Sequence, residues 1–162
     1  MTGTPMPLLE LAAKGGSASL VRWCLERGAS PADAPSATRD LAAEGRAEAL
    51  RVLLAAGASP DDADDGGITP LHFAADRDHA ACVDALLEAG ASVDPRSVSR
   101  RYTPLMLAAL HGFDACVERL LAAGASRELR DVDGRDALYW AKQGGHDACV
   151  ALLAARKRAR RS

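Results

Sequence analysis

Thr69-Pro70-Leu71-His72-Phe73-Ala74-Ala75 is the most informative stretch of this 162-residue sequence, because its pattern returns along the chain. The same positions are filled by Thr103-Pro104-Leu105-Met106-Leu107-Ala108-Ala109 and, more loosely, by Asp136-Ala137-Leu138-Tyr139-Trp140-Ala141-Lys142. A second pattern, Leu86-Leu87-Glu88-Ala89-Gly90-Ala91-Ser92, recurs at residues 24–30, 53–59 and 120–126, and its glycine steps by 29, 33 and 34 residues. A fixed period of this length predicts a repeat protein.

Each copy is expected to be a pair of short helices. Thr69 can cap the first helix, and Pro70 suits its first position because a missing N–H costs nothing there. The equivalent caps are Ser36, Thr103 and Asp136, and all four are expected to accept a hydrogen bond from a free backbone N–H. The second helix should end at Gly90, which tolerates a left-handed conformation. Helices this short are unstable alone, so each pair must pack on its neighbours.

The sequence resembles the ankyrin repeat, whose T-P-L-H-x-A signature is matched by Thr69, Pro70, Leu71, His72 and Ala74. The resemblance implies an all-α fold, an ankyrin-repeat solenoid of stacked helix-turn-helix hairpins with short β-hairpin-like finger loops. It also implies that His72 ties neighbouring repeats by a hydrogen bond. It covers nearly the whole chain as a single domain, residues 1–162, with repeats at about 5–30, 31–63, 64–97, 98–130 and 131–158.

The connectors between copies differ in length. The one from Gly28 to Ser36 is four residues shorter than the one from Gly57 to Thr69, so the first finger should be truncated.

Composition excludes several classes of protein. Hydrophobic residues make up 48% of the chain and charged residues 26%, which is too apolar for a disordered chain. The apolar runs are shorter than a membrane span and the N-terminus lacks a signal peptide, so a cytoplasmic protein is expected. There is no nucleophile with a base, no phosphate-binding glycine loop and no pair of inward carboxylates. We therefore expect no enzyme activity and no cofactor.

The four cysteines raise the question of a metal site or a disulfide. Cys82, Cys116 and Cys149 occupy one position of the repeat, and stacked helices lie about 8 to 10 Å apart. A disulfide needs Cα atoms within roughly 7 Å. We expect free thiols that pack between the two helices of each repeat, and no metal site.

The resemblance implies that binding side chains lie just before the T-P-L-H segment and just after its alanines. These positions hold Ile68, Asp76, Arg77, Arg100, Tyr102, Leu110, His111, Arg135 and Gln143. Ile68, Tyr102 and Arg135 are equivalent, so they should form one row, free of packing duties. Tyrosine and arginine are enriched at binding hot spots. The sequence predicts a monomeric, non-catalytic protein–protein interaction module that binds a protein partner through its concave finger and first-helix face.

The C-terminus leaves alternatives open. Five of the 20 Lys and Arg residues lie within residues 156–161, so the rest of the chain has 15 basic against 22 acidic side chains. In one interpretation the last helix runs on past Ala155 and these cations complement its dipole. In another, the basic C-terminal tail 156–162 makes the chain a nucleic-acid or anionic-surface adaptor, although the acidic body disfavours nucleic acid. A third hypothesis is an inhibitor or escort of a specific enzyme.

Overall fold

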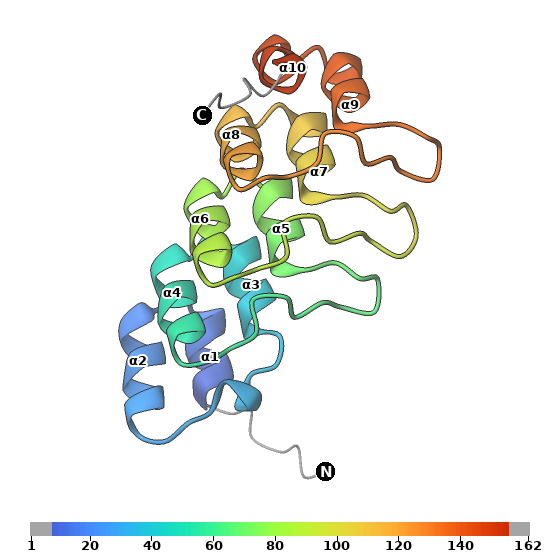
Figure 1. Cartoon of the computed structure of the whole chain (residues 1–162). Helices are drawn as coiled ribbons and strands as arrows, with labels where there is room; N and C mark the ends of the chain where they lie inside the picture. Colours follow the sequence, from blue (N-terminus) through green and yellow to red (C-terminus); the bar gives the residue numbers. More distant parts are fainter. Residues whose placement is uncertain (1–7, 156–162) are drawn as a thin grey trace, which may run out of the picture.

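The computed structural model describes residues 8–155, which form a row of stacked helix pairs (Figure 1). The helices are α1 (Leu8–Lys14), α2 (Ala18–Glu26), α3 (Ala37–Ala43), α4 (Ala47–Ala55), α5 (Pro70–Asp76), α6 (Ala80–Glu88), α7 (Pro104–His111), α8 (Asp114–Ala122), α9 (Ala137–Gly144) and α10 (Asp147–Ala154), with one 3₁₀ turn, η1 (Pro31–Asp33). No residue in this range belongs to a β-strand. The predicted all-α solenoid is confirmed.

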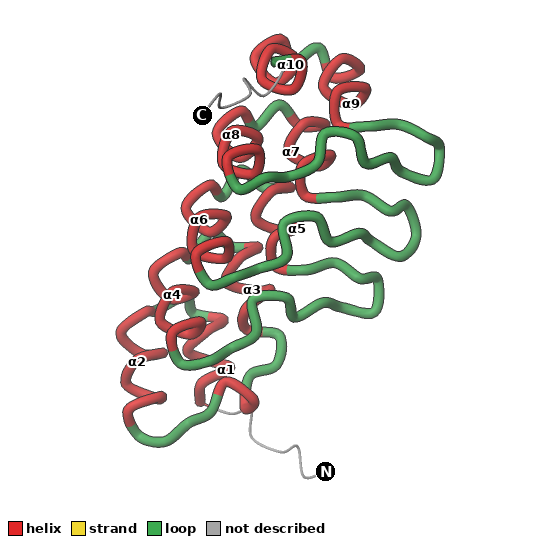
Figure 2. Tube along the Cα trace, viewed as in Figure 1, coloured by secondary structure: helices red, strands yellow, loops and turns green. Residues whose placement is uncertain are grey.

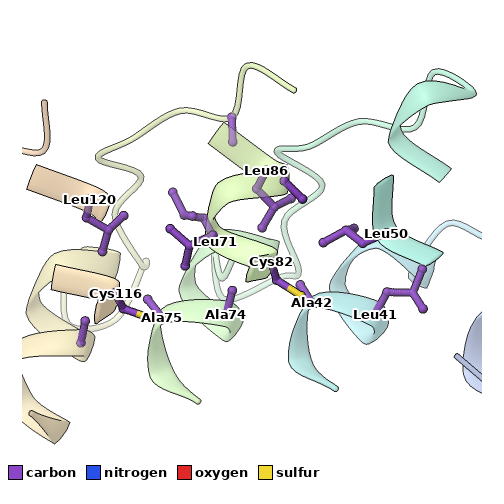
Figure 3. Close-up of a cluster of buried hydrophobic side chains, with 14 of the residues drawn as sticks. Leu41, Ala42, Leu50, Leu71, Ala74, Ala75, Cys82, Leu86, Cys116 and Leu120 are labelled. Atoms are coloured by element: carbon purple, nitrogen blue, oxygen red, sulfur yellow. The ribbon is translucent and has the colours of Figure 1, made fainter. Parts of the chain in front are cut away.

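The odd-numbered helices lie in one layer and the even-numbered helices in a second (Figure 1). Each helix contacts its partner in the pair and the next helix of its own layer. Small side chains let the helices approach, since Ala74, Ala75, Ala108 and Ala109 are fully buried. Leucines such as Leu71, Leu86 and Leu120 fill the remaining space (Figure 3). The core therefore runs along the whole stack, as expected when each repeat contacts only its neighbours.

Two of the four predicted helix caps are formed by a side-chain oxygen that accepts a backbone N–H three residues later. The distances are 3.3 Å at Thr103 and 2.9 Å at Asp136. Thr69 forms a reciprocal cap with His72, whose Nδ1 accepts the Thr69 N–H at 3.1 Å. These contacts satisfy donors that a helix N-terminus otherwise leaves free.

The prediction that Ser36 caps α3 is wrong. Its backbone is already helical, with φ −91° and ψ −7°, and its side chain makes no capping hydrogen bond. The hydroxyl instead donates to the Asp40 carboxylate at 2.9 Å. A capping residue needs an extended backbone so that its oxygen can turn back to the free N–H groups. The shortened connector brings the chain to Ser36 in a different direction.

Three long loops, residues 57–69, 90–103 and 124–136, project beyond the odd-numbered helices as fingers (Figure 2). The main chain of one finger hydrogen-bonds to the next, since the Val98 N–H donates to the Gly66 carbonyl at 2.8 Å and the Val132 N–H to the Arg100 carbonyl at 3.2 Å. The connection between α2 and α3 is short and contains η1, so the first finger is truncated as expected.

Left-handed backbone occurs where the chain reverses. Gly90 has φ 87°, which confirms the predicted end of α6. Within the fingers, Gly67 and Gly134 have φ 69° and 77°, whereas the equivalent residue of the middle finger is Arg101, with φ 58°. A side chain makes this conformation costly, so Arg101 is held there by its surroundings.

The cysteines are free and buried, but Cys82 and Cys116 do not pack as predicted. Cys116 Sγ on α8 lies 3.7 Å from Oδ1 of Asp78, which belongs to the preceding repeat. Figure 3 shows Cys116 beside Ala75 of α5, and Cys82 of α6 in the same relation to Ala42 of α3. Cys82 and Cys116 thus fill the space between repeats, because the rotation of the second helix turns their position towards the preceding pair.

The last helix does not extend into the basic tail, as one interpretation of the sequence expected. Helix α10 ends at Ala154, and Ala155 has an extended backbone with φ −62° and ψ 114°. The expectation that this helix continues past Ala155 is therefore wrong, since a short helix persists only where its apolar side packs on a neighbour. The tail 156–162 lies outside the described residues.

Candidate partner-binding surface

The residues predicted to bind a partner lie at the ends of the fingers that lead into α5, α7 and α9, and at the C-terminal ends of these helices. We call this surface the finger face. Its first row, at the finger bases, consists of Ile68, Tyr102 and Arg135. A ledge at the C-terminal ends of the helices consists of Asp76, Arg77, Leu110, His111 and Gln143. The fold holds both rows in one register, because each repeat places equivalent residues at equivalent points.

Tyr102 is fixed by its main chain. Its N–H donates to Ser97 Oγ at 3.0 Å, and its carbonyl accepts a hydrogen bond from His72 Nε2 at 2.9 Å. The side chain is half-buried and packs against the core. Tyr102 therefore contributes to packing as well as to the surface, contrary to the expectation that its row has no packing duty.

His72 connects two repeats, as the resemblance implied. Because Nδ1 accepts the Thr69 N–H at 3.1 Å, the ring proton lies on Nε2 and is donated to the Tyr102 carbonyl. Burial lowers the pKa of His72 below its ordinary value, and the hydrogen bond to Tyr102 opposes this only in part. The neutral ring therefore fixes the middle finger relative to α5 at physiological pH.

An aromatic cluster lies at the last repeat, where Tyr102 and Trp140 belong to the finger face and Tyr139 occupies the position equivalent to His72. The Tyr102 and Trp140 rings meet edge to face, with centroids 5.7 Å apart, and Tyr139 packs on Trp140 in the same way at 5.5 Å. Trp140 Nε1 donates to Asp131 Oδ2 at 3.2 Å. Rings held in this way present a rigid apolar surface that loses little conformational freedom on binding.

Arginine side chains border the aromatic cluster. The Arg135 guanidinium lies 5.2 Å from the Tyr139 ring centroid and 5.4 Å from that of Trp140. Asp133 forms ion pairs with Arg135 at 3.2 Å and with Arg100 at 3.7 Å. This arrangement joins the last two fingers and orients a guanidinium over aromatic faces, which is a favourable cation–π geometry.

A shallow hollow of about 200 Å³ lies between α5 and α7. It is lined by Ile68, His72, Phe73, Asp76 and Leu107. Ile68 and Asp76 were predicted from the sequence, and they are brought together here from the finger base and the ledge. The hollow is large enough for part of a side chain, not for a metabolite, since small-molecule sites measure about 300 to 1,000 Å³.

A middle row of the finger face was missed by sequence reasoning. It consists of Phe73, Leu107 and Trp140, which are equivalent and half-buried. A signal for this row was present, because each residue precedes its ledge residues by three or four positions and so lies on the same side of the helix. These side chains supply much of the apolar floor between the two predicted rows.

The ledge carries polar contacts between repeats. Asp76 and His111 are hydrogen-bonded between α5 and α7, with His111 Nε2 3.1 Å from Asp76 Oδ1. Arg77 donates to the Ala43 carbonyl at the end of α3, also at 3.1 Å. Leu110 is half-buried, whereas Gln143 is exposed at the last repeat. The predicted ledge residues thus follow one line, and three of them, Asp76, Arg77 and His111, already have partners within the chain.

The thiols offer no nucleophile to this surface. Burial raises the pKa of Cys82 to about 11 and, together with the Asp78 carboxylate, that of Cys116 to about 12. Among residues 8–155, no group of three or more His, Cys, Asp or Glu side chains could hold a metal ion. The same part of the chain has no helix both long and apolar enough to cross a bilayer.

Comparison with known proteins agrees with this architecture. A family model described as "Ankyrin repeats (3 copies)" matches residues 9–97 and 91–160. The chain is similar to Protein fem-1 homolog A-A of Mus musculus and Protein fem-1 homolog A of Rattus norvegicus, with 43% identity to each over 54 residues. That stretch is 33% of this chain and 8% of either relative, so the chain matches only a small part of their length. Since the family model spans most of the sequence, the chain belongs to the ankyrin repeat family.

Proposed function

We propose that this protein is a non-catalytic module that binds a protein partner through its finger face. Ankyrin repeats generally mediate protein–protein interaction. The observation that carries the proposal here is the aromatic cluster of Tyr102, Tyr139 and Trp140 with Arg135 stacked against it. Tyrosine, tryptophan and arginine are the side chains that most often dominate binding energy.

The shape of the surface favours a macromolecular partner. The finger face is long and its hollow shallow, so it suits a partner that makes many contacts along several repeats. The aromatic cluster would form the apolar centre of the interface, where water is excluded. Arg77 and Arg100 lie at its edge, where charged groups set orientation and the rate of association.

The experiment begins with the recovery of partners by the immobilised chain and the measurement of their affinity. Arg135→Ala should then weaken binding by about 2 kcal/mol, or roughly thirtyfold, if Arg135 is a hot spot. Arg51→Ala is a closely matched control. Arg51 lies on α4. Its side chain, like that of Arg135, is 37% exposed and forms an ion pair at 3.2 Å, with Glu88 in the one case and Asp133 in the other.

The two variants separate the proposed interface from the opposite layer. Loss of affinity with Arg135→Ala and unchanged affinity with Arg51→Ala would support the finger face. The reverse result would place the interface on the even-numbered helices. Equal affinities for both variants and the unchanged chain would remove Arg135 from the binding site.

A further inference from the structure

The N-terminal end of the stack exposes an apolar surface that the finger face does not use. Leu8 and Leu11 of α1 are 57% and 58% exposed, and Leu20 and Trp23 of α2 are 54% and 43% exposed. Together they line a groove of about 440 Å³ between the two helices. We call this surface the end face. End repeats of solenoids usually turn a polar surface to water, so this one is unusual.

Two residues of the end face, Leu8 and Leu20, occupy positions that every later repeat buries. The residues equivalent to Leu8 are Ala37, Pro70, Pro104 and Ala137, and those equivalent to Leu20 are Ala49, Cys82, Cys116 and Cys149. All eight are buried. In the first repeat alone, both positions hold leucine and both are exposed.

The size of these side chains disfavours a further repeat stacked in the same register. Alanine, proline and cysteine at the two positions let the preceding helix pair approach closely, and leucine projects too far for that distance. A second copy stacked head to tail would meet the same obstacle. The end face is therefore shaped for an occupant that approaches in another orientation.

We propose that the end face binds the end face of a second copy of this chain, which gives a two-fold symmetric dimer. Such a contact is self-complementary, because the leucine ridges of each copy can enter the groove of the other. The groove is lined by uncharged residues, so two copies bring no like charges together at its centre. Trp23, with the Arg27 guanidinium 3.9 Å from its ring centroid, provides a Trp–Arg pair at the rim.

The area of the end face sets the expected strength. Helices of seven and nine residues, about 9 Å apart, present roughly 300 to 500 Å² of surface in each copy. Twice this area, roughly 600 to 1,000 Å², lies below that of stable interfaces, which bury about 1,200 to 2,000 Å², and within the range of weak, transient ones. The dimer should therefore be weak and reversible, with a Kd of about 10 to 300 µM. This departs from the monomer predicted from sequence.

Sedimentation equilibrium of the full chain from about 1 to 300 µM tests the proposal. The mean mass should rise towards twice that of the monomer. Leu20→Glu should raise the dimer Kd at least about tenfold, because it places like charges in a small apolar contact. Val98→Glu, at a fingertip that is 71% exposed, makes the same chemical change elsewhere and should leave the Kd unchanged. Circular dichroism should be used to verify that each variant is folded.

Several results would overturn the proposal. One is a chain that remains monomeric at the highest concentration. Another is a series of species larger than dimers, which would indicate head-to-tail stacking. A third is an equal loss of dimer in both variants. If only a chain lacking residues 1–7 dimerises, those residues cover the end face, and the second copy is not its natural occupant.

Discussion

Replacement of His72 by methionine tests the hydrogen bond that joins two repeats. Methionine is a suitable substitute because Met106 occupies the equivalent buried position of the next repeat. The change keeps an apolar body of similar size but removes the donor to the Tyr102 carbonyl and the acceptor for the Thr69 N–H. Each backbone group left without a partner costs about 1 to 3 kcal/mol.

The expected loss of stability is about 2 to 4 kcal/mol, since the greater apolar character of methionine offsets part of the cost. Urea denaturation followed by circular dichroism measures it. His111→Met is the control, because its side chain is 44% exposed at the surface and the change should cost less than about 0.5 kcal/mol. An unfolding free energy that is the same for His72→Met and the unchanged chain would refute the structural role of His72.

The same pair of proteins gives a pH test. The pKa of His72 is lowered in the folded state from its ordinary value of 6.5, so the unfolded chain binds more protons below that pH. The contribution of His72 is complete above about pH 6.5 and declines as pH falls towards the folded pKa. The stability difference between the chain and His72→Met should shrink by at most about 1.4 kcal/mol per pH unit. A difference that is constant from pH 7.5 to 5.5 would contradict this.

Three further predictions concern the backbone, the thiols and the tail. In urea denaturation, Arg101→Gly should stabilise the chain by about 0.5 to 1 kcal/mol by relieving left-handed strain. Gly134→Ala should destabilise it by about 1 kcal/mol, because Gly134 has φ 77° although an added Cβ would meet no neighbouring atom. Stability changes of the same sign would contradict this. Because burial raises the pKa of Cys82 to about 11 and that of Cys116 to about 12, both should react with a thiol reagent at pH 8 only after unfolding. Rapid reaction of these two thiols in the folded chain would contradict their burial. Removal of residues 156–162 should change neither the unfolding free energy nor partner affinity at moderate salt, and a large, salt-dependent loss of affinity would favour the anionic-surface adaptor instead.

Much of the fold could be predicted because the same residue types begin and end the helices in successive repeats. Thr103 and Asp136 precede helices that need a cap, and Gly90 stands where only a left-handed residue ends the helix. These features depend on residues close in sequence. Ser36 looked the same but failed as a cap, because the direction of the incoming chain depends on the shortened connector.

The binding surface was harder to predict because it depends on contacts between repeats. The positions of Tyr102 and Arg135 followed from the resemblance, but their packing around Trp140 requires the relative placement of two fingers and α9. The prediction for the orientation of Cys116 was wrong for a similar reason, since this orientation depends on how one helix is rotated relative to the preceding helix pair. Periodicity identifies which residues share a side of a helix, not which neighbour that side meets.

The central claim is that a protein partner binds the finger face, and hydrogen exchange of the free and partner-bound chain tests it most directly. Binding should slow amide exchange in the fingers at residues 90–103 and 124–136 and leave α4, α6 and α8 unchanged. Protection confined to the even-numbered helices or to α1 and α2, with unchanged exchange in these fingers, would contradict the claim.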